Sequence, residues 1–355
     1  MKTDKKHQHY IPKFYLRNFS YNQNKNEIGI FNIFNNIFVQ RAKLRHQGSK
    51  NFFYGIDGKI EDALANIEGN LAELIKNIIS NQSLPRKFSI EHIELLSFVA
   101  ITDSRNPVRI DAMKNHFSQM EKTLRELDPN VDIDKILPRL SHEEHIKLSL
   151  SNTHTITEHI VDLDFKLLVN KTSNTFLTSD FPIVKYNKFL ELKKWKHSKT
   201  GYSLVGLKIF IPLSPILTVV FFDSLIYKIG NKKDKIIEIS RKEDIDQLNI
   251  LQFVNSFSTI FFNEAITEDY INYLKDKSQK YIRANDPKLE LSYIVEKNDD
   301  VDKVLAGKQN LMIFNTTDCE INLNLSFLKI HSNGKHYKLD SRFTQVRKPY
   351  KKYKY

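Results

Sequence analysis

The sequence has a single cysteine, Cys319, and only ten glycines among its 355 residues. One thiol cannot build a disulfide framework or a cysteine-based zinc site, which leads us to expect a reducing, cytoplasmic location. No glycine-rich phosphate loop and no Gly-x-Ser-x-Gly elbow is present, so dinucleotide, Walker-type and α/β-hydrolase sites are not expected. The longest apolar run, residues 209–222, is interrupted by Pro212 and Pro215 and is too short for a transmembrane segment.

What the chain has instead is positive charge and enough apolar residues for a core. The formal net charge is +12, and 41% of the residues are hydrophobic. Residues 185–208 hold seven lysines and one acid, and residues 347–355 form a basic, tyrosine-rich tail. Cations follow phosphates and aromatic rings stack on bases, so nucleic acid is the predicted partner. Lysine-rich coding in an A+T-rich genome and ordinary solvated loops are equally open explanations.

The apolar spacing predicts an α+β fold. Residues 27–42 read as a hairpin, and residues 59–160 carry apolar side chains at helical spacing. Within that helical part, Ser89 is placed to cap a buried helix and Asn106-Pro107 to end it. Residues 163–265 are strand-rich. We therefore predict a central helical segment between an N-terminal strand-rich hairpin and a mixed or antiparallel C-terminal sheet, forming a core of residues 1–285, then a strand-rich extension over 286–355.

Several short motifs resemble, in order, those of an uncharacterised bacterial family, domain of unknown function 4238. The opening His9-Tyr10-Ile11-Pro12-Lys13-Phe14-Tyr15-Leu16 is similar to its His-Tyr-Val/Ile-Pro-x-Phe-Tyr-Leu stretch. Further similarities are found at Asn51–Tyr54, at Glu61 and Glu68, at Arg105-Asn106-Pro107, at Phe176–Pro182 and at Pro212–Pro215. The resemblance covers about residues 5–265 and implies no activity, so the chemistry has to come from the residues.

The opening stretch carries the first candidate site. His9 could act as a general acid or base and Tyr10 could supply a hydroxyl, while His7 and His9 share one face of an extended segment and could chelate a metal. Lys13 and Arg17 stand four apart, so a helix starting at Pro12 would present both cations to an anionic substrate. The alternative is that the aromatic residues pack and His9 bonds a backbone carbonyl.

The second candidate site is the polar run Thr178-Ser179-Asp180 at the end of an apolar strand. Active-site acids are common at strand ends. If Glu191 and Lys193 lie on the next strand, Asp180 and Glu191 could bind Mg²⁺ while Lys193 steadies the attacking water, as in restriction-type nucleases. Thr178 and Ser179 would then contact substrate. The alternative is that Asp180 satisfies backbone groups in a turn.

The third candidate is Arg105, which could clamp a phosphate or pair internally with Glu61, Glu68 or Asp180.

Our leading hypothesis is a nuclease or other phosphate-ester-acting enzyme in which His9, Tyr10, Arg105 and Asp180 converge, with Mg²⁺ as a possible cofactor. Basic charge and family type suggest bacterial phage defence. The alternative is a non-catalytic nucleic-acid-binding or protein-interaction module. Convergence of these residues in space would separate the two.

Overall fold

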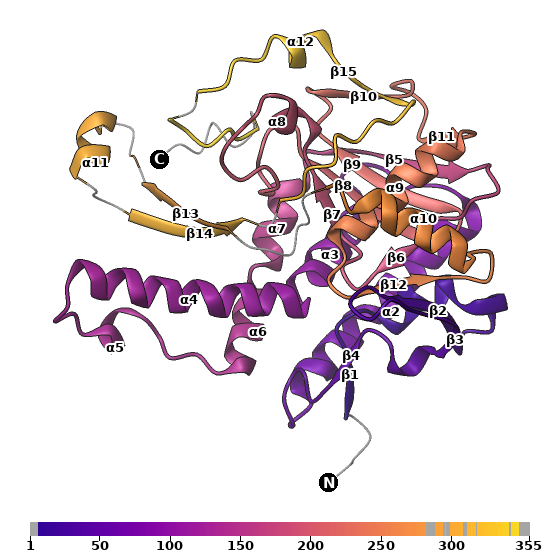
Figure 1. Cartoon of the computed structure of the whole chain (residues 1–355), viewed down its shortest axis with the longest axis horizontal. Coiled ribbons are helices and arrows are strands. Elements are labelled where there is room, and N and C mark those ends of the chain that lie inside the picture. The colour runs from indigo at the N-terminus through magenta and orange to yellow at the C-terminus, as the bar shows by residue number, and fades with distance from the viewer. Residues whose placement is uncertain are drawn as a thin grey trace.

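The computed structural model describes residues 6–281, 288–293, 295, 299–307, 311–316, 318–340 and 342–347. Its order confirms the predicted α+β class: strands come first, then a run of helices, then mixed and antiparallel sheets (Figure 1). The first strands are β1 (His7–His9), β2 (Glu27–Asn32), β3 (Ile37–Lys43) and β4 (Ser49–Asn51), with helix α1 (Lys13–Leu16) between β1 and β2. Short 3-10 turns span Arg17–Phe19, Tyr21–Gln23 and Leu44–His46.

The central helices are α2 (Lys59–Asn81), α3 (Ile90–Ser104), α4 (Pro107–Leu127), α5 (Ile133–Ile136), α6 (His142–Ser151) and α7 (Thr153–Ile160). Their boundaries follow from local chemistry. The hydroxyl of Ser89 accepts from the backbone N–H of His92 at 3.3 Å, which confirms the predicted cap of α3. Asn106 caps α4 in the same way through Val108, with Pro107 as the first helical residue. Among the described helices, none is both long and apolar enough to cross a membrane.

Two sheets organise the rest of the chain. A five-stranded mixed sheet has the order β11 (Ile236–Ile239), β5 (Asp164–Asn170), β9 (Leu217–Phe222), β8 (Lys208–Ser214), β7 (Val184–Tyr186), with only β11 and β5 parallel. A four-stranded antiparallel sheet has the order β3, β2, β12 (Thr259–Phe262), β6 (Thr178–Ser179). The N-terminal hairpin therefore joins strands that lie more than 130 positions later in the chain.

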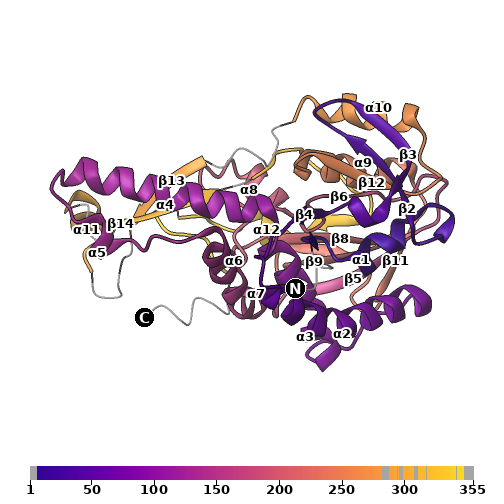
Figure 2. The ribbon, with the colours of Figure 1, turned by 90° about the horizontal axis from the view of Figure 1, so that it is seen from below.

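The five-stranded sheet separates two hydrophobic cores (Figure 2). Along β8 and β9 the side chains alternate: Ile209 and Val219 face the core under α1, α2 and α3, while Phe210 and Val220 face the core under α9 (Lys242–Asn255) and α10 (Glu268–Ser278). This alternation is what a sheet buried on both faces requires. Residues 11–19, which include the family-like opening motif, belong to the first core.

Tyr15 ties that opening motif to both sheets. Its hydroxyl donates to the carbonyl of Pro212 at 2.7 Å and lies 2.7 Å from the hydroxyl of Thr178. The side chain is fully buried, and burial raises its pKa, so the phenol stays protonated. The motif from residue 9 to residue 16 is therefore in large part a packing element.

Tyr15→Phe is expected to lower the free energy of unfolding by about 1–2 kcal/mol, because the ring still packs but the two buried oxygen partners lose their hydrogen bonds. Urea denaturation would measure the loss. Tyr21→Phe is the matched control, since Tyr21 is only partly buried and contacts Arg41 through its ring face. Equal stability of the wild type and Tyr15→Phe would contradict the role assigned to the hydroxyl.

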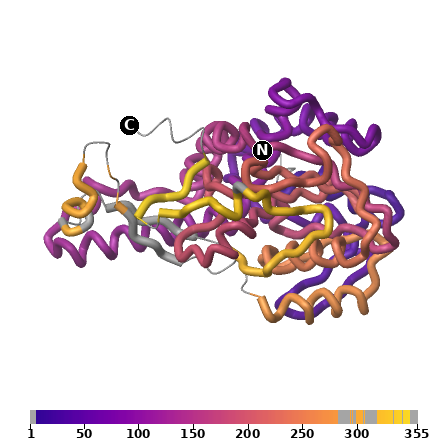
Figure 3. The backbone as a smooth tube through the Cα atoms, turned by 90° about the horizontal axis from the view of Figure 1, so that it is seen from above, coloured from indigo at the N-terminus to yellow at the C-terminus, as the bar shows by residue number. Residues whose placement is uncertain are grey.

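The remaining elements are α8 (Lys188–Leu192), β10 (Tyr227–Ile229), β13 (Lys288–Tyr293), α11 (Val301–Gly307), β14 (Leu311–Thr316), β15 (Leu328–Ile330) and α12 (Ser332–Lys335). The described residues after 285 include strands, as expected, and also the helices α11 and α12, which were not predicted. Part of it, the yellow segment in Figure 3, runs back across the core. Cys319, Ile321, Leu323 and Leu325 alternate with exposed residues and enter the second core.

Arg347 corrects one sequence-based expectation. It was assigned to a solvated basic tail, but its side chain is buried and forms a two-point ion pair with Asp162, with N–O distances of 2.7 and 2.9 Å. It also donates to the carbonyls of Tyr202 and Leu204 at 2.9 Å. The rest of that predicted tail, residues 348–355, lies outside the described residues.

Candidate functional site

His9 lies at the end of β1, which pairs antiparallel with β4. The neighbouring Gln8 turns to the other face and donates to the carbonyl of Gly55 at 2.8 Å, which fixes the strand against the loop before α2. His9 itself is 6% exposed, and its Nε2 finds no hydrogen-bond partner among the described residues. Burial, helped by the charges of Lys13 and Arg105, lowers the pKa of His9 to about 4. The imidazole is therefore neutral at pH 7.

The tautomer of His9 follows from its surroundings. The backbone carbonyls of Arg45 and His7 interact with the ring and partly oppose the fall in its pKa. Nε2 has no partner in the described part of the chain, so a ring that donates to one of these carbonyls does so from Nδ1 and keeps the lone pair on Nε2. In that tautomer His9 is a buried acceptor, the form needed for a general base.

Arg105 stands at the end of α3 and reaches the same region. Its guanidinium is 1% exposed and pairs with Glu68 of α2 at 2.6 Å, whose side chain is 27% exposed. Burial alone would lower the pKa of Arg105, but Tyr54 and Glu68 raise it, so the cation persists. The internal pairing that was one of two predicted roles is therefore present. The Nε–H of Arg105 is nonetheless buried and has no partner within the described ranges.

Two tyrosines connect these groups. Tyr54 is buried and donates its hydroxyl to the backbone carbonyl of His9 at 3.1 Å, and it also interacts with Arg105. Tyr10 is packed against Phe53, with 5.9 Å between ring centres. Burial, followed by the charge of Asp180 and by Tyr54, raises the pKa of Tyr10, so it remains a hydroxyl donor. Tyr54 was named from the sequence only as part of a motif, and its position between His9 and Arg105 could not be inferred.

Asp180 is buried, and backbone donors surround its carboxylate. The N–H groups of Phe257, Ser258 and Thr259 donate to it at 2.8, 2.7 and 3.0 Å, and the Ser258 hydroxyl donates at 2.7 Å. Burial raises the pKa of Asp180, while these hydrogen bonds act in the opposite direction. The alternative of backbone satisfaction is thus present, although the donors come from the end of the α9–β12 loop and the first residue of β12 instead of a local turn. The local turn is made by Ser179, whose hydroxyl accepts from Phe181 N at 3.1 Å.

The junction between α3 and α4 joins these pieces. Five consecutive polar residues are buried there: Thr102, Asp103, Ser104, Arg105 and Asn106. Asn106 donates to the carbonyl of Asp180 at 2.7 Å. A run of five buried polar residues at the end of an apolar helix is unusual, because each buried polar group needs a hydrogen-bond partner. The five polar residues in a row are the sequence signal that could have located this junction.

Asp103 gathers a second set of charges that the sequence did not single out. It pairs with Arg109 at 3.3 Å and with Lys185 at 3.5 Å, and the hydroxyl of Tyr202 donates to it. Burial and the neighbouring Arg109 lower the pKa of Lys185 to about 8. The arrangement braces β7 against the α3–α4 junction.

The nuclease-like arrangement of Glu191 and Lys193 is wrong. Both were expected on a strand, but Glu191 lies in helix α8 and Lys193 is the residue that ends it. Glu191 accepts from the Tyr186 hydroxyl and from Asn322 N at 2.7 Å, and Lys193 donates to the carbonyl of Lys335 at 3.0 Å. With donors around both carboxylates, Asp180 and Glu191 do not fit a shared Mg²⁺ site. The described residues include no group of three or more His, Cys, Asp or Glu arranged for a metal.

The other predicted side chains divide into buried and exposed groups. Thr178 is buried against Tyr15, and the Ser179 hydroxyl donates to Gln252 at 2.9 Å, so both are packing contacts. Lys13 and Arg17 are exposed on and just after α1, as predicted. The charge of Lys13 reaches His9. Those two cations are thus the predicted substrate-binding residues that remain accessible on the side of His9.

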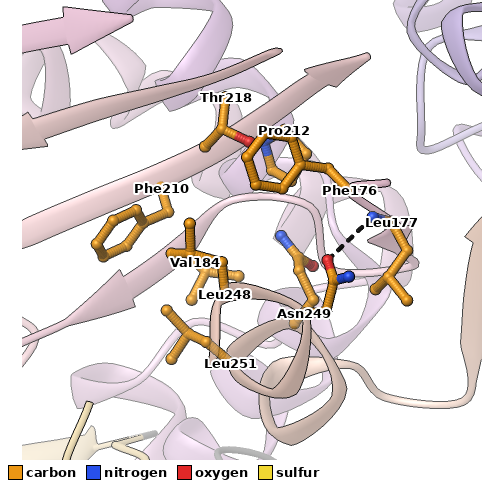
Figure 4. A pocket seen from close by; sticks show the side chains of 10 residues that line it. Phe176, Leu177, Val184, Phe210, Pro212, Thr218, Leu248, Asn249 and Leu251 are labelled. Atoms are coloured by element: carbon orange, nitrogen blue, oxygen red, sulfur yellow. Dashed lines mark hydrogen bonds between the residues drawn. The ribbon is translucent and has the colours of Figure 1, made fainter. Parts of the chain in front are cut away.

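Two cavities formed by described residues lie away from this cluster. Figure 4 shows a cavity of about 10 Å³ between α9 and the five-stranded sheet, lined by residues such as Phe176, Thr218 and Asn249. It is about the size of one water molecule and cannot hold a substrate. A larger cavity of about 510 Å³ lies between the start of α9 and residues 321–326, and none of the predicted site residues lines it.

Comparison with known families now decides the membership of the chain. The family model described as protein of unknown function DUF4238 matches residues 7–265. The chain belongs to the DUF4238 family. No curated protein and no solved structure matches it. The match leaves residues 266–355 of this DUF4238 chain outside the family model, including the segment that fills the second core.

The family-like motifs of this DUF4238 protein come together around the α3–α4 junction. His9 and Tyr10 come from the opening stretch, Tyr54 from the loop before α2, Arg105 from α3, and Asp180 follows β6. Hydrogen bonds or charge interactions link each of them to a neighbour in this set. Convergence of this kind, rather than any single motif, is what makes the cluster a candidate functional site.

Proposed function

We propose that this DUF4238 protein acts on a phosphate ester, with nucleic acid as the substrate, and that His9 is its general base. One observation carries the proposal: His9 Nε2 and Arg105 Nε are both buried, both lack a partner among the described residues, and lie within electrostatic reach of each other. Buried polar atoms are normally satisfied, so an unpaired acceptor beside an unpaired cationic donor favours a site that receives a polar group from a ligand.

The proposed chemistry uses these groups in a fixed order. His9 Nε2 takes the proton from the attacking oxygen, which is water or the 2′-hydroxyl of RNA. Arg105 stabilises the negative charge that develops on the phosphate oxygens. Tyr10, which stays protonated, donates a hydrogen bond to the leaving oxygen; that oxygen takes its proton from solvent, and protonated His9 returns its own proton to solvent. Asp180 acts as a positioning residue, because its carboxylate holds the loop before β12 and its carbonyl holds Asn106.

His9→Ala is expected to lower kcat/KM for cleavage of RNA or DNA at least about 100-fold, because a positioned base contributes about that much. Purified protein would be tested on both nucleic acids, with Mg²⁺ and with EDTA. Since His9 stays neutral above a pKa of about 4, the wild-type rate is expected to be flat from about pH 5 to 8. His7→Ala is the matched control, as His7 is exposed on the same strand. Full activity of both His9→Ala and Asp180→Ala would remove the catalytic assignment.

The second candidate is a non-catalytic module that binds nucleic acid through its basic loops. It is supported by the exposure of Lys193, Lys194 and Lys196, which flank the end of α8. Such a module would bind with strong salt dependence and show no hydrolysis in the same assay. A role in phage defence stays a prediction from charge and family type.

A further inference from the structure

Two phenylalanine rings stand exposed at one end of the four-stranded sheet. Phe34 lies in the turn of the β2–β3 hairpin and Phe257 in the loop between α9 and β12. Their ring centres are 5.8 Å apart in an edge-to-face contact, yet 62% and 43% of the two residues remain exposed. Keeping aromatic surface in water costs free energy, so a paired and exposed set of rings indicates a binding surface.

The backbone under both rings is fixed. The N–H of Phe34 donates to the Asn32 side chain at 3.0 Å, and Ile33 N donates to the carbonyl of Ser258 at 2.8 Å. The N–H of Phe257 donates to the buried carboxylate of Asp180 at 2.8 Å. The rings are therefore presented by two loops that are bonded to each other, and a ligand would lose little affinity to ordering them.

The ring pair is continuous with the candidate site through Asp180. Its carboxylate holds Phe257, and its charge reaches Tyr10. The ring of Phe181, the residue after Asp180, lies 5.1 Å from the guanidinium of Arg109, whose side chain is 22% exposed. Asp180 thus holds the exposed residue Phe257 and is followed by a ring that contacts a cation.

We propose that Phe34 and Phe257 form a stacking platform for an unpaired base, so that the substrate of the candidate site is single-stranded nucleic acid. The inference rests on the proposed function for its substrate class. A base offers a flat face that stacks on an aromatic ring, and this face is available only when the base is unpaired. The partly exposed guanidinium of Arg109, which also pairs with Asp103, is the cation that we assign to the adjoining phosphate. Two rings beside the polar Asn35-Asn36 turn offer far less area than the roughly 800 Å² per partner of a stable protein interface.

Fluorescence anisotropy would test the platform with single-stranded oligonucleotides of about 12 residues and with the matching duplexes. Binding would be measured for the full chain in EDTA and in a His9→Ala background, so that cleavage does not interfere. We expect the single strand to bind more tightly than the duplex. Phe34→Ser with Phe257→Ser is expected to weaken single-strand binding about 5- to 100-fold, and Phe34→Trp to retain it.

Phe88→Ser is the matched control, because Phe88 is 68% exposed and lies before the opposite end of the 15-residue helix α3, about 20 Å from Arg105. It should bind as the wild type does. Equal loss in Phe88→Ser, unchanged binding in the Phe34/Phe257 variant, equal affinity for duplex, or no binding at all would each overturn the platform. So would a dimer, seen by light scattering, that Phe34→Ser dissociates.

The two proposals can fail separately. If the wild type cleaves nucleic acid and the Phe34/Phe257 variant binds and cleaves equally well, the platform is wrong and the proposed function stands. If the binding pattern is found but no strand is cleaved under any condition, the platform stands and the catalytic role of His9 is wrong.

Discussion

Asp180→Ala is expected to lower the free energy of unfolding by about 3 kcal/mol, because three partly buried N–H groups lose their acceptor and each such loss costs about 1–3 kcal/mol. Two donors, Phe257 and Ser258, lie in the loop before β12, and the third, Thr259, is the first residue of β12. Without the carboxylate this loop would have to rearrange or draw water into the protein interior. Urea denaturation followed by circular dichroism would measure the change.

Asp180→Asn is the informative companion to that variant. It keeps one carbonyl oxygen and the shape of the side chain, so we expect a smaller loss of stability than in the alanine variant. If both variants were as stable as the wild type, the carboxylate would not be the brace that its four hydrogen bonds indicate. Activity should be compared only between variants that are folded at the assay temperature.

The second large effect is a loss of stability in acid. Burial lowers the pKa of both His9 and His92 to about 4, against about 6.5 in the unfolded chain. As the pH falls below 6.5, the unfolded chain takes up these protons while the folded protein does not. The free energy of unfolding therefore decreases until about pH 4. Each shift corresponds to about 3 kcal/mol, and stability should be constant above about pH 7 as far as these two groups are concerned.

Urea midpoints measured from pH 7 to pH 4 would check this. His9→Gln and His92→Gln should each make the loss of stability between pH 7 and pH 4 smaller than in the wild type. His154→Gln, on an exposed part of α7, should keep the whole loss. The ring of His92 stacks on Phe165 with 4.6 Å between centres, so His92→Gln will also lose packing and be less stable at every pH. A stability that does not change down to pH 4 would contradict the burial of both rings.

The helices and their caps were readable from the sequence because they depend on neighbours within a few positions. Ser89 caps α3 as predicted, and the predicted break at Asn106-Pro107 separates α3 from α4. The cap that Asn106 forms on α4 was not predicted. The α+β class followed from the same local periodicities. What local patterns cannot give is the partner of a strand, and the pairing of β2 with β12 was therefore open.

The candidate site, too, could be predicted from the sequence only in part. His9, Tyr10, Arg105 and Asp180 could be chosen as a group because each is a polar residue in an otherwise packed motif. Their roles could not be assigned, since these depend on contacts such as Arg105 with Glu68, which are 37 residues apart. Glu191 failed for a different reason: a five-residue helix is too short to have a periodicity of its own, so Asn187 as its cap was the only signal.

The buried pair of Arg347 and Asp162 has a consequence for how the protein folds. The two residues are 185 positions apart. Contacts of such sequence separation carry a large loop-closure entropy and form slowly. We infer that this ion pair forms late in folding, when the segment that carries Arg347 docks against the helix end and strand on either side of Asp162.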